Sequence, residues 1–408
     1  MQKSSNKTML FFICLLAICF AVILSHNYKI IGNKKITCFS TYSLNIIDDL
    51  QNEVDTELDN LNTNQLDDLL SNLTEQQKSI FGDVSITEKI KNIINGSERF
   101  EIGDFFKVIV SVLFENLSGV IPILASICSI AILGSILVQM RGNKMNKSLA
   151  DIIHFACYGV IVVLVFGGVV QLVNVASQTL NALKTQMEIT FPILLTLMAS
   201  LGSTTSVAIY QPMIAVLCGI MMQVFLKIVL PIFSLTLVFN VIGNLTSTVK
   251  LSKFSGFLSS LFKTIITFAF TIFASFLALS GIVASSADNI SIRATKFAIK
   301  SYIPLIGGYL SDGFNLIMAS SVLIKNAIGY TGIVVIFVTI ISPLIKIYLY
   351  KLGLSLVAGI IEPVADKRVT EFVSTTSKSM SMLASIILAF SFAYIICVGL
   401  IMCSSNVV

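Results

Sequence analysis

Long runs of apolar residues, separated by short polar or basic breaks, dominate the chain from about residue 105 onward. Several runs exceed the ~18 residues that a helix needs to cross the hydrocarbon core of a bilayer. The pattern therefore predicts an all-α, polytopic membrane protein. We expect six spans, at about 119–138, 152–175, 213–241, 264–284, 332–350 and 382–403.

Two further apolar stretches are interrupted near their middle and do not fit simple spans. The first, 191–210, begins with Phe191 and Pro192 and breaks at Gly202. The second, 302–325, contains a group of helix-breaking or polar residues, namely Pro304, Gly307, Gly308, Asp312 and Gly313. Non-helical backbone at membrane depth must be buried in protein or line water, because lipid satisfies no hydrogen bonds. We predict that both stretches are re-entrant hairpins.

The basic residues between the predicted spans favour this topology. With two hairpins, the loops assigned to the cytoplasm hold Arg141, Lys144, Lys147, Lys250, Lys253, Lys263, Lys351, Lys367, Arg368 and Lys378. The outer side, beyond the N-terminal region, holds Lys184, Arg293, Lys296, Lys300 and Lys325. Cytoplasmic loops carry the excess of Lys and Arg in most membrane proteins. If one hairpin crossed fully, every later loop would invert; if both crossed, only the middle basic loop would be misplaced.

The second half of the membrane region echoes the first, over about 151–245 and 262–352. Val175-Ala176-Ser177 has a counterpart in Val283-Ala284-Ser285, Pro192 has one in Pro304, and Gly202 has one in Gly313. Paired broken segments in two halves of a chain point to a transporter-like centre. The alternative is chance matching of small and apolar residues in a biased sequence.

The N-terminus predicts a secretory signal. Lys3 and Lys7 precede an apolar run, so that 1–26 is a signal peptide or a retained signal anchor. Either form places 27–104 outside the cytoplasm. This region is acidic, with fourteen of the 22 acids between Asp48 and Asp104, and its apolar residues follow helical spacing. We interpret it as a small helical extracytoplasmic region, either a solvated spacer or a docking surface.

Composition excludes several classes of function. Hydrophobic residues make up 55% of the chain and charged residues 12%, about half the share in soluble domains. The net charge of +5 reflects Lys and Arg in short loops and does not suggest nucleic acid. The eight cysteines are scattered and only two histidines occur, so we expect no disulfide framework, metal site or cofactor. The sequence has no P-loop, zincin or nucleophile-elbow motif, and we expect no enzymatic activity.

Two groups of polar residues are candidates for a permeation or gating role. Asp312 lies near the middle of an apolar segment, where a carboxylate needs a partner such as Lys325 or Arg293, or water. The alternative is a residue at the turn of a hairpin near the surface. Asp288, Arg293 and Lys296 lie on one short segment with a basic face, which predicts an interfacial helix that binds anionic lipid or a partner protein.

Several stretches resemble the stage III sporulation protein AE family of endospore-forming Firmicutes. They are the ten residues from Phe191 (FPILLTLMAS), the six from Ile292 (IRATKF), the six from Ile303 (IPLIGG) and the seven from Ser320 (SSVLIKN). The resemblance covers roughly 100–403, and the N-terminal signal and acidic region match only in layout. None of these motifs is catalytic.

The resemblance implies a role in the development of the engulfed forespore. It implies a subunit, with a permease-like core as one form of that role, of a channel or feeding-tube complex in the mother-cell membrane around the forespore. The implied partners are other stage III sporulation membrane proteins, in a homo- or hetero-oligomer within the lipid bilayer. The residues themselves leave two alternatives open: an autonomous secondary transporter, or a structural anchor that recruits other subunits.

Overall fold

The computed structural model describes residues 54–56, 58, 86–94, 102–139, 147–245, 252–302 and 307–404. Nearly all of these residues are helical, and the described ranges contain no strand. The elements are α5 (Ile86–Ile94), α6 (Ile102–Gln139), α7 (Lys147–Ser200), α8 (Thr204–Val224), the π-helical turn η2 (Phe225–Val229), α9 (Leu230–Leu245), α10 (Ser252–Tyr302), α11 (Gly307–Ile361) and α12 (Lys367–Cys403). The predicted all-α membrane fold is confirmed.

Six segments of the described chain are long and apolar enough to cross a membrane. They run over Ile109–Leu137, Phe155–Ser200, Thr204–Gly243, Lys253–Ala278, Asn315–Ile361 and Lys367–Cys403, in the order of the six predicted spans. Their helices are much longer than the sequence suggests. The 54 residues of α7 extend for about 81 Å at 1.5 Å per residue, whereas a hydrocarbon core is about 30 Å thick.

The first predicted hairpin, 191–210, does not form a separate re-entrant element, so this prediction is wrong. Pro192 lies inside α7, which continues without a break from the predicted second span to Ser200. The chain turns only at 201–203, where Gly202 has a φ of 77°, and α8 then begins at Thr204. The helix accommodates Pro192 because a proline there removes a single backbone hydrogen bond and this position is exposed. The segment 191–210 therefore joins two long antiparallel helices.

The second predicted hairpin is also wrong in its position. Gly307, Gly308, Asp312 and Gly313 all lie in the first two turns of α11, so they do not interrupt a helix. The chain changes direction instead between Tyr302, where α10 ends, and Gly307. Pro304 lies in this connection, outside the described residues. The helix tolerates its glycines because glycine lowers helix stability without removing a backbone donor.

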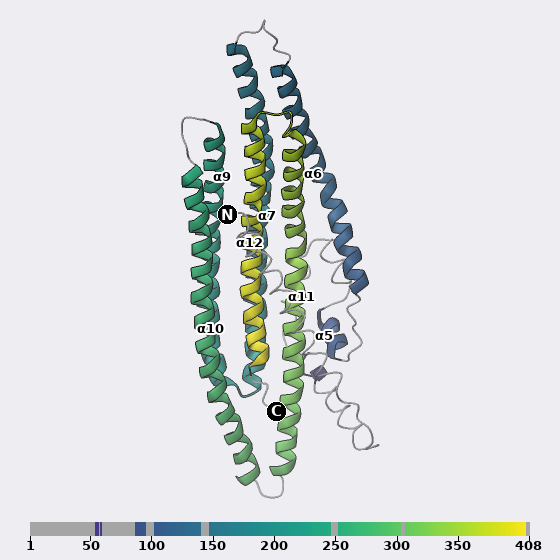
Figure 1. Cartoon of the computed structure of the whole chain (residues 1–408). Helices are drawn as coiled ribbons and strands as arrows, with labels where there is room; N and C mark the ends of the chain where they lie inside the picture. Colours follow the sequence, from purple (N-terminus) through teal and green to yellow (C-terminus); the bar gives the residue numbers. More distant parts are fainter. Residues whose placement is uncertain are drawn as a thin grey trace.

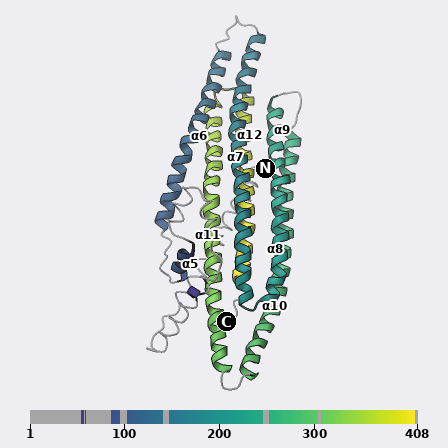
Figure 2. The ribbon, with the colours of Figure 1, turned by 180° about the vertical axis from the view of Figure 1, so that it is seen from behind.

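Figure 1 shows that the six long helices run roughly parallel to one axis and change direction at two opposite ends. One end, called here the basic end, holds the C-termini of α6, α9 and α11 and the N-termini of α7, α10 and α12. The α7–α8 turn, the α10–α11 connection and the C-terminus of α12 lie toward the other end. Views from both sides agree on this arrangement (Figures 1 and 2).

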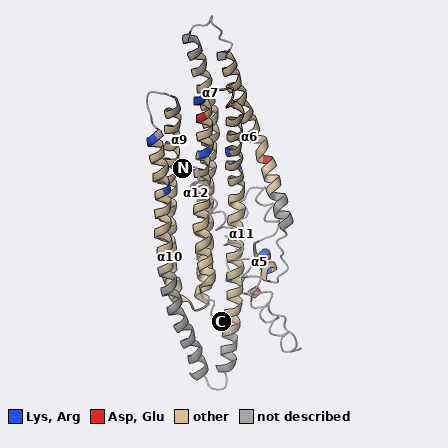
Figure 3. Cartoon of the chain, in the orientation of Figure 1, with Lys and Arg blue, Asp and Glu red and all other residues tan. Residues whose placement is uncertain are grey.

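The grouping of connections explains the charge pattern. The three loops that the positive-inside count assigned to one side, around residues 144, 250 and 367, are flanked by helix ends that all lie at the basic end. In the view of Figure 3, most Lys and Arg of the described long helices lie on the half nearest that end, and α5 carries a further group. The predicted distribution therefore follows from the helical hairpins, although neither hairpin is re-entrant.

Helix α12 forms the centre of the core, and it packs against α7, α9 and α11. Among the six long apolar segments of the described chain, α12 is the most buried. Glycines allow the surrounding helices to approach closely. A Cβ atom at Gly168 would overlap the Tyr350 ring of α11, and one at Gly353 would overlap Leu124 of α6. Small residues at crossings are typical of membrane helix bundles.

The predicted interfacial helix is part of a longer element, and the acidic region contributes a short helix of its own. The predicted interfacial helix with Asp288, Arg293 and Lys296 is the last third of α10, which runs unbroken from Ser252; these three side chains lie outside the described ones. In the acidic region, where the spacing of apolar residues predicts helices, α5 forms over Ile86–Ile94. Helix α5 contacts α11, and Ile90 is fully buried in the common core. The described part of this region thus packs on the membrane domain.

The two stretches of the predicted repeat lie in two long helical hairpins, one formed by α7 with α8 and α9, and the other by α10 with α11, and the repeat itself stays a prediction. The proposed residue matches do not hold in detail. Pro192 lies nine residues before its turn and inside a helix, whereas Pro304 lies in the connection itself. Likewise, Gly202 forms a turn and Gly313 lies within α11. The two hairpins share an order of elements but differ in register.

Candidate functional site

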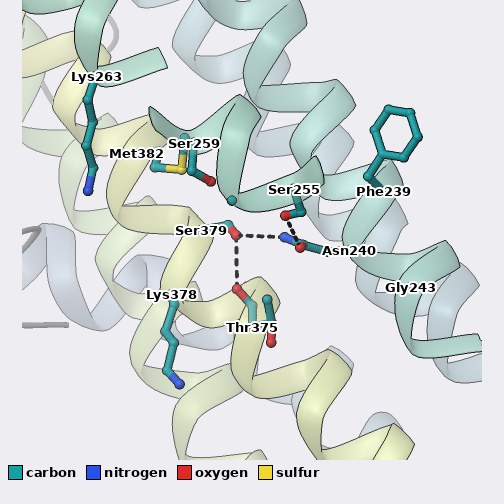
Figure 4. A pocket seen from close by; sticks show the side chains of 11 residues that line it. Phe239, Asn240, Gly243, Ser255, Ser259, Lys263, Thr375, Lys378, Ser379 and Met382 are labelled. Atoms are coloured by element: carbon teal, nitrogen blue, oxygen red, sulfur yellow. Dashed lines mark hydrogen bonds between the residues drawn. The ribbon is translucent and has the colours of Figure 1, made fainter. Parts of the chain in front are cut away.

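A polar pocket opens near the basic end, between α9, α10 and α12. Its cavity of about 370 Å³ is lined by Phe239, Asn240, Gly243, Ser255, Gly256, Ser259, Lys263, Thr375, Lys378, Ser379 and Met382. On α10 the polar members follow i, i+4, i+8 spacing, so that Ser255, Ser259 and Lys263 share one face of the helix. The helices thereby collect polar side chains that are widely separated along the sequence (Figure 4).

A hydrogen-bond network fixes the wall of this pocket. Ser255 Oγ donates to Asn240 Oδ1, and Asn240 Nδ2 donates to Ser379 Oγ over 3.4 Å. Ser379 Oγ in turn donates to the carbonyl oxygen of Thr375 over 3.0 Å. Ser255 and Ser379 are 6% and 7% exposed. Buried polar groups cost free energy unless they are hydrogen-bonded, so this network holds α9, α10 and α12 in one arrangement.

The charge of the pocket is positive. Lys263 and Lys378 are exposed at its rim, and no Asp or Glu lines it. The ion pairs found within the described ranges, Lys91–Asp55, Lys184–Glu188 and Lys367–Glu371, do not involve either lysine. The pocket therefore presents two ammonium groups and several hydroxyl and amide groups. This set of groups suits the binding of an anion.

A second polar feature lies inside the bundle, between α7, α11 and α12. Gln186 Nε2 donates to Thr339 Oγ1 over 2.6 Å, and Tyr394 OH donates to Thr190 Oγ1 over 3.1 Å. Gln186 Oε1 is buried and has no hydrogen-bond partner within the described part of the chain. A buried amide oxygen of this kind needs a water molecule or another donor. The C-terminal half of α7 thus carries polar groups on its inner face.

Lys325 is fully buried in α11, and its Nζ donates to the carbonyl oxygen of Ser404, the C-cap of α12. A cation at the C-terminus of a helix is stabilised by the carbonyl groups that end there. Lys325 cannot be the partner of Asp312, because thirteen residues of one helix separate them by about 20 Å. That part of the sequence hypothesis is wrong.

The outward face of α7 changes character at Gln171. From Ile152 to Val170 its exposed large side chains are apolar. Over the next five turns the exposed positions are Gln171, Asn174, Gln178, Asn181, Ala182, Lys184, Thr185 and Glu188, and we call their polar members the α7 polar face. Lys184 and Glu188 form an exposed ion pair at 3.3 Å. The opposite side of these turns is buried and mainly apolar, including Leu172, Ala176, Leu180, Leu183 and Met187.

The α7 polar face has an apolar counterpart at the same height of the bundle. Helices α7 and α8 are antiparallel about the turn at 201–203, and Tyr158 OH donates to the carbonyl oxygen of Val241 over 3.5 Å. Residues equally distant from the turn are therefore level with one another. At the height of the α7 polar face, α8 and η2 expose the apolar residues Val216, Ile220 and Ile228, together with the polar residues Gln223 and Lys227. The exposed positions of α7 at this height are thus almost all polar, whereas those of α8 and η2 are mainly apolar.

None of the predicted site residues lies on the α7 polar face or lines the pocket. Among the predicted site residues, Pro192 and Gly202 lie on α7 and at its turn, while Gly307, Gly308, Asp312 and Gly313 lie at the start of α11. In the sequence, Lys263 and Lys378 count only as loop charges. The signal that could have indicated the pocket is the run of Ser255, Ser259 and Lys263 at helical spacing in an otherwise apolar segment.

These features define a class of protein: a polytopic helical membrane protein with polar surfaces built into its bundle. Within the described ranges, no cluster of His, Cys, Asp or Glu could hold a metal ion. The family model for stage III sporulation protein AE matches residues 84–405, so the chain belongs to that family. It is therefore a sporulation-related membrane protein.

A curated relative supports this assignment. The chain is 22% identical over 321 residues to the stage III sporulation protein AE of Bacillus subtilis (strain 168), an alignment that covers 78% of this chain and 79% of the relative. No solved structure matches the chain. The matched residues include α5 and all six long helices, so the family region extends beyond the membrane domain into the acidic N-terminal region.

Proposed function

We propose that this chain is a non-enzymatic subunit of a channel or feeding-tube complex in the mother-cell membrane around the forespore, and that its α7 polar face lines a water-filled conduit there. The observation that carries the conduit is the lateral asymmetry of the bundle. Apolar side chains at the height of Ile220 suit lipid, whereas amide and charged groups at the same height are costly to expose to hydrocarbon. A second copy or another subunit would close the conduit around this face.

Orientation is part of the same proposal. The basic end faces the mother-cell cytoplasm, because it collects the loops that are rich in Lys and Arg. Helix α5 packs on the half of α11 that is farther from the basic end (Figure 1). This location agrees with an N-terminal region that lies outside the cytoplasm, on the side that faces the forespore.

Paired cysteine substitutions test the conduit. In a chain whose eight native cysteines are replaced, Asn181→Cys and Ile220→Cys lie at nearly the same distance from the α7–α8 turn. In sporulating cells we expect a small water-soluble thiol reagent to label position 181 and not position 220. Labelling of both would place this height outside the bilayer, and labelling of neither would indicate a dry helix contact. Either result would contradict the conduit.

The sporulation role is tested by deletion and by function-specific variants. A strain without the gene should engulf its forespore and then fail in late forespore transcription and spore yield. Replacement of Asn174 and Gln178 by Leu should reproduce this defect with normal protein levels, whereas Gln223→Leu, an exposed glutamine on α8, should not. Normal spores from the deletion strain would overturn the role in sporulation.

The second candidate function, a structural anchor that recruits other subunits, is favoured by the packing of α5 on α11. An anchor predicts that the Asn174 and Gln178 variants sporulate normally, while substitutions in the N-terminal region prevent co-purification of the other stage III sporulation membrane proteins. The leucine variants therefore separate the two functions.

A further inference from the structure

Two charges of opposite sign are exposed on helices that are apolar enough to cross the membrane. Glu115 lies on α6, inside the apolar segment Ile109–Leu137, and Lys227 lies on η2, inside the segment Thr204–Gly243. Both residues are exposed, and neither takes part in the ion pairs found among the described residues. An exposed charge at membrane depth is costly unless it meets a partner or water. Both charges therefore need a partner that a single copy does not supply.

The two charges lie on opposite sides of the α7 polar face. Helix α7 packs against α6, α8, α11 and α12, whereas α6 and α8 do not pack closely against each other. In Figure 2, α7 lies in front of α12, with α6 on one side and α8 on the other. The exposed face of α7 therefore opens between α6 and α8, which form its two flanks.

The two charges also lie at the same height of the bundle. A Cβ atom at Gly134 of α6 would be 2.9 Å from Cys157 Sγ of α7, so these two positions are level. Because α6 and α7 are antiparallel, Glu115 is then level with about residue 176, within the α7 polar face. Counting along α8 and η2 from the α7–α8 turn places Lys227 within one helical turn of the same height.

Apolar side chains next to the charges show the same match. Phe114 of α6 and Ile228 of η2, each adjacent in sequence to one of the charges, are 68% and 44% exposed. About two turns nearer the basic end, Ile121 of α6 and Leu235 of α9 are exposed at a matching height. Both flanks also run toward the basic end. The α6 flank and the flank formed by α8, η2 and α9, called here the α8 flank, are thus complementary as parallel partners, acid to base and apolar to apolar.

We propose that a second copy of this chain docks on the first, with its α6 flank against the α8 flank, so that Glu115 of one copy pairs with Lys227 of the next. A lipid tail would satisfy neither charge, whereas a second copy satisfies both with one repeated contact. The contact is head-to-tail because the two flanks are different surfaces, and such contacts build a ring when the rotation closes. It rests on the conduit proposal for its role, since one copy exposes the α7 polar face and a ring of copies encloses it.

Disulfide cross-linking tests the contact directly. The full chain, with its eight native cysteines replaced, carries Glu115→Cys and Lys227→Cys and is oxidised in membranes with copper phenanthroline. We expect a ladder of reducible multimers in electrophoresis without reducing agent. The matched control combines Glu115→Cys with Val238→Cys, an exposed position about three turns nearer the basic end, and should stay monomeric. Equal dimer yields from Glu115→Cys alone would indicate a symmetric dimer and would overturn the head-to-tail contact.

Charge reversal tests the ion pair itself. Two differently tagged copies are expressed in the same cells, and one is purified through its tag. Glu115→Lys or Lys227→Glu in both copies should lower recovery of the other copy at least about tenfold, because like charges then meet. The double reversal should restore recovery, and Glu362→Lys, which reverses an exposed acid at the basic end, should have no effect. Failure of the double reversal, in variants that elute as folded protein from a sizing column, would overturn the pair.

The outcomes separate this contact from the conduit. Labelling of Asn181→Cys without a cross-linked ladder would mean that another protein closes the conduit, and it would overturn the contact between copies. A ladder together with an unlabelled position 181 would support the contact and contradict the conduit.

Discussion

At the scale of single residues, the fold depends on a few positions where two helices come unusually close. Gly168 is the sharpest example, because Tyr350 of α11 occupies the space where a side chain would stand. Tyr350 OH also donates to the carbonyl oxygen of Val165 over 2.9 Å, one turn earlier on α7. The neighbouring Gly167 faces outward, and a Cβ atom added there would meet no neighbouring heavy atom within 4 Å. Gly168 thus permits the close approach of α7 and α11, whereas Gly167 has no role in this contact.

Gly168→Ala should destabilise the protein. The added methyl group displaces the Tyr350 ring, and overpacking of this kind costs about 1–3 kcal/mol. Thermal unfolding of the purified protein in detergent should show a lower Tm. Gly167→Ala should leave Tm unchanged or raise it, since alanine favours a helix over glycine. Similar shifts in the two variants would show that the α7–α11 contact is not formed as described.

Lys325→Met should loosen the end of α12. The substitution keeps an apolar stem of similar length but removes the donor to the Ser404 carbonyl oxygen, and a lost buried hydrogen bond costs about 1–3 kcal/mol. Carboxypeptidase digestion of the purified protein should then remove C-terminal residues faster. Lys346→Met, on the same helix and half-buried, is the control. Equally fast digestion of both variants would argue against the Lys325–Ser404 contact.

At the scale of elements, hydropathy predicted the number and order of the long helices but not their lengths. The predicted second span ended at residue 175 because the following residues are polar on one side. Helix α7 nevertheless continues to Ser200, since a helix with one buried apolar face needs no uniform hydropathy. The pocket could not be predicted for a related reason: Lys263 and Lys378 are brought together only by the packing of α10 against α12.

The sequence analysis placed a break at Gly202, and the α7–α8 turn lies there. We expect Gly202 to be essential to the stability of this turn. Gly202 N donates to the Ala199 carbonyl oxygen over 2.9 Å, and its φ of 77° is unfavourable for other residues. Gly202→Ala should cost about 1–2 kcal/mol. Gly219→Ala, an exposed glycine inside α8, should have no such effect. Chemical denaturation in mild detergent compares the two, and equal stability would refute the turn geometry.

At the scale of the whole molecule, the hairpins place three connections at the basic end and two at the other. Cysteines introduced at 143, 248 and 364 should therefore share one accessibility, and those at 204 and 305 should show the opposite one. The measurement is labelling of non-sporulating cells that express the protein in their cytoplasmic membrane with a membrane-impermeant maleimide, before and after permeabilisation. We expect the first group to react only after permeabilisation. Alternating reactivity within the first group would contradict the arrangement of helices in Figure 1.

The length of α11 has a practical consequence. Its 55 residues extend for about 82 Å, and even a tilt of 40° would leave it more than about 60 Å tall across a hydrocarbon core of about 30 Å. A detergent belt can cover only part of that height. Purified particles should therefore show helical density that protrudes from the micelle. For a chain of only 44.3 kDa, this density would help to align particle images in electron microscopy.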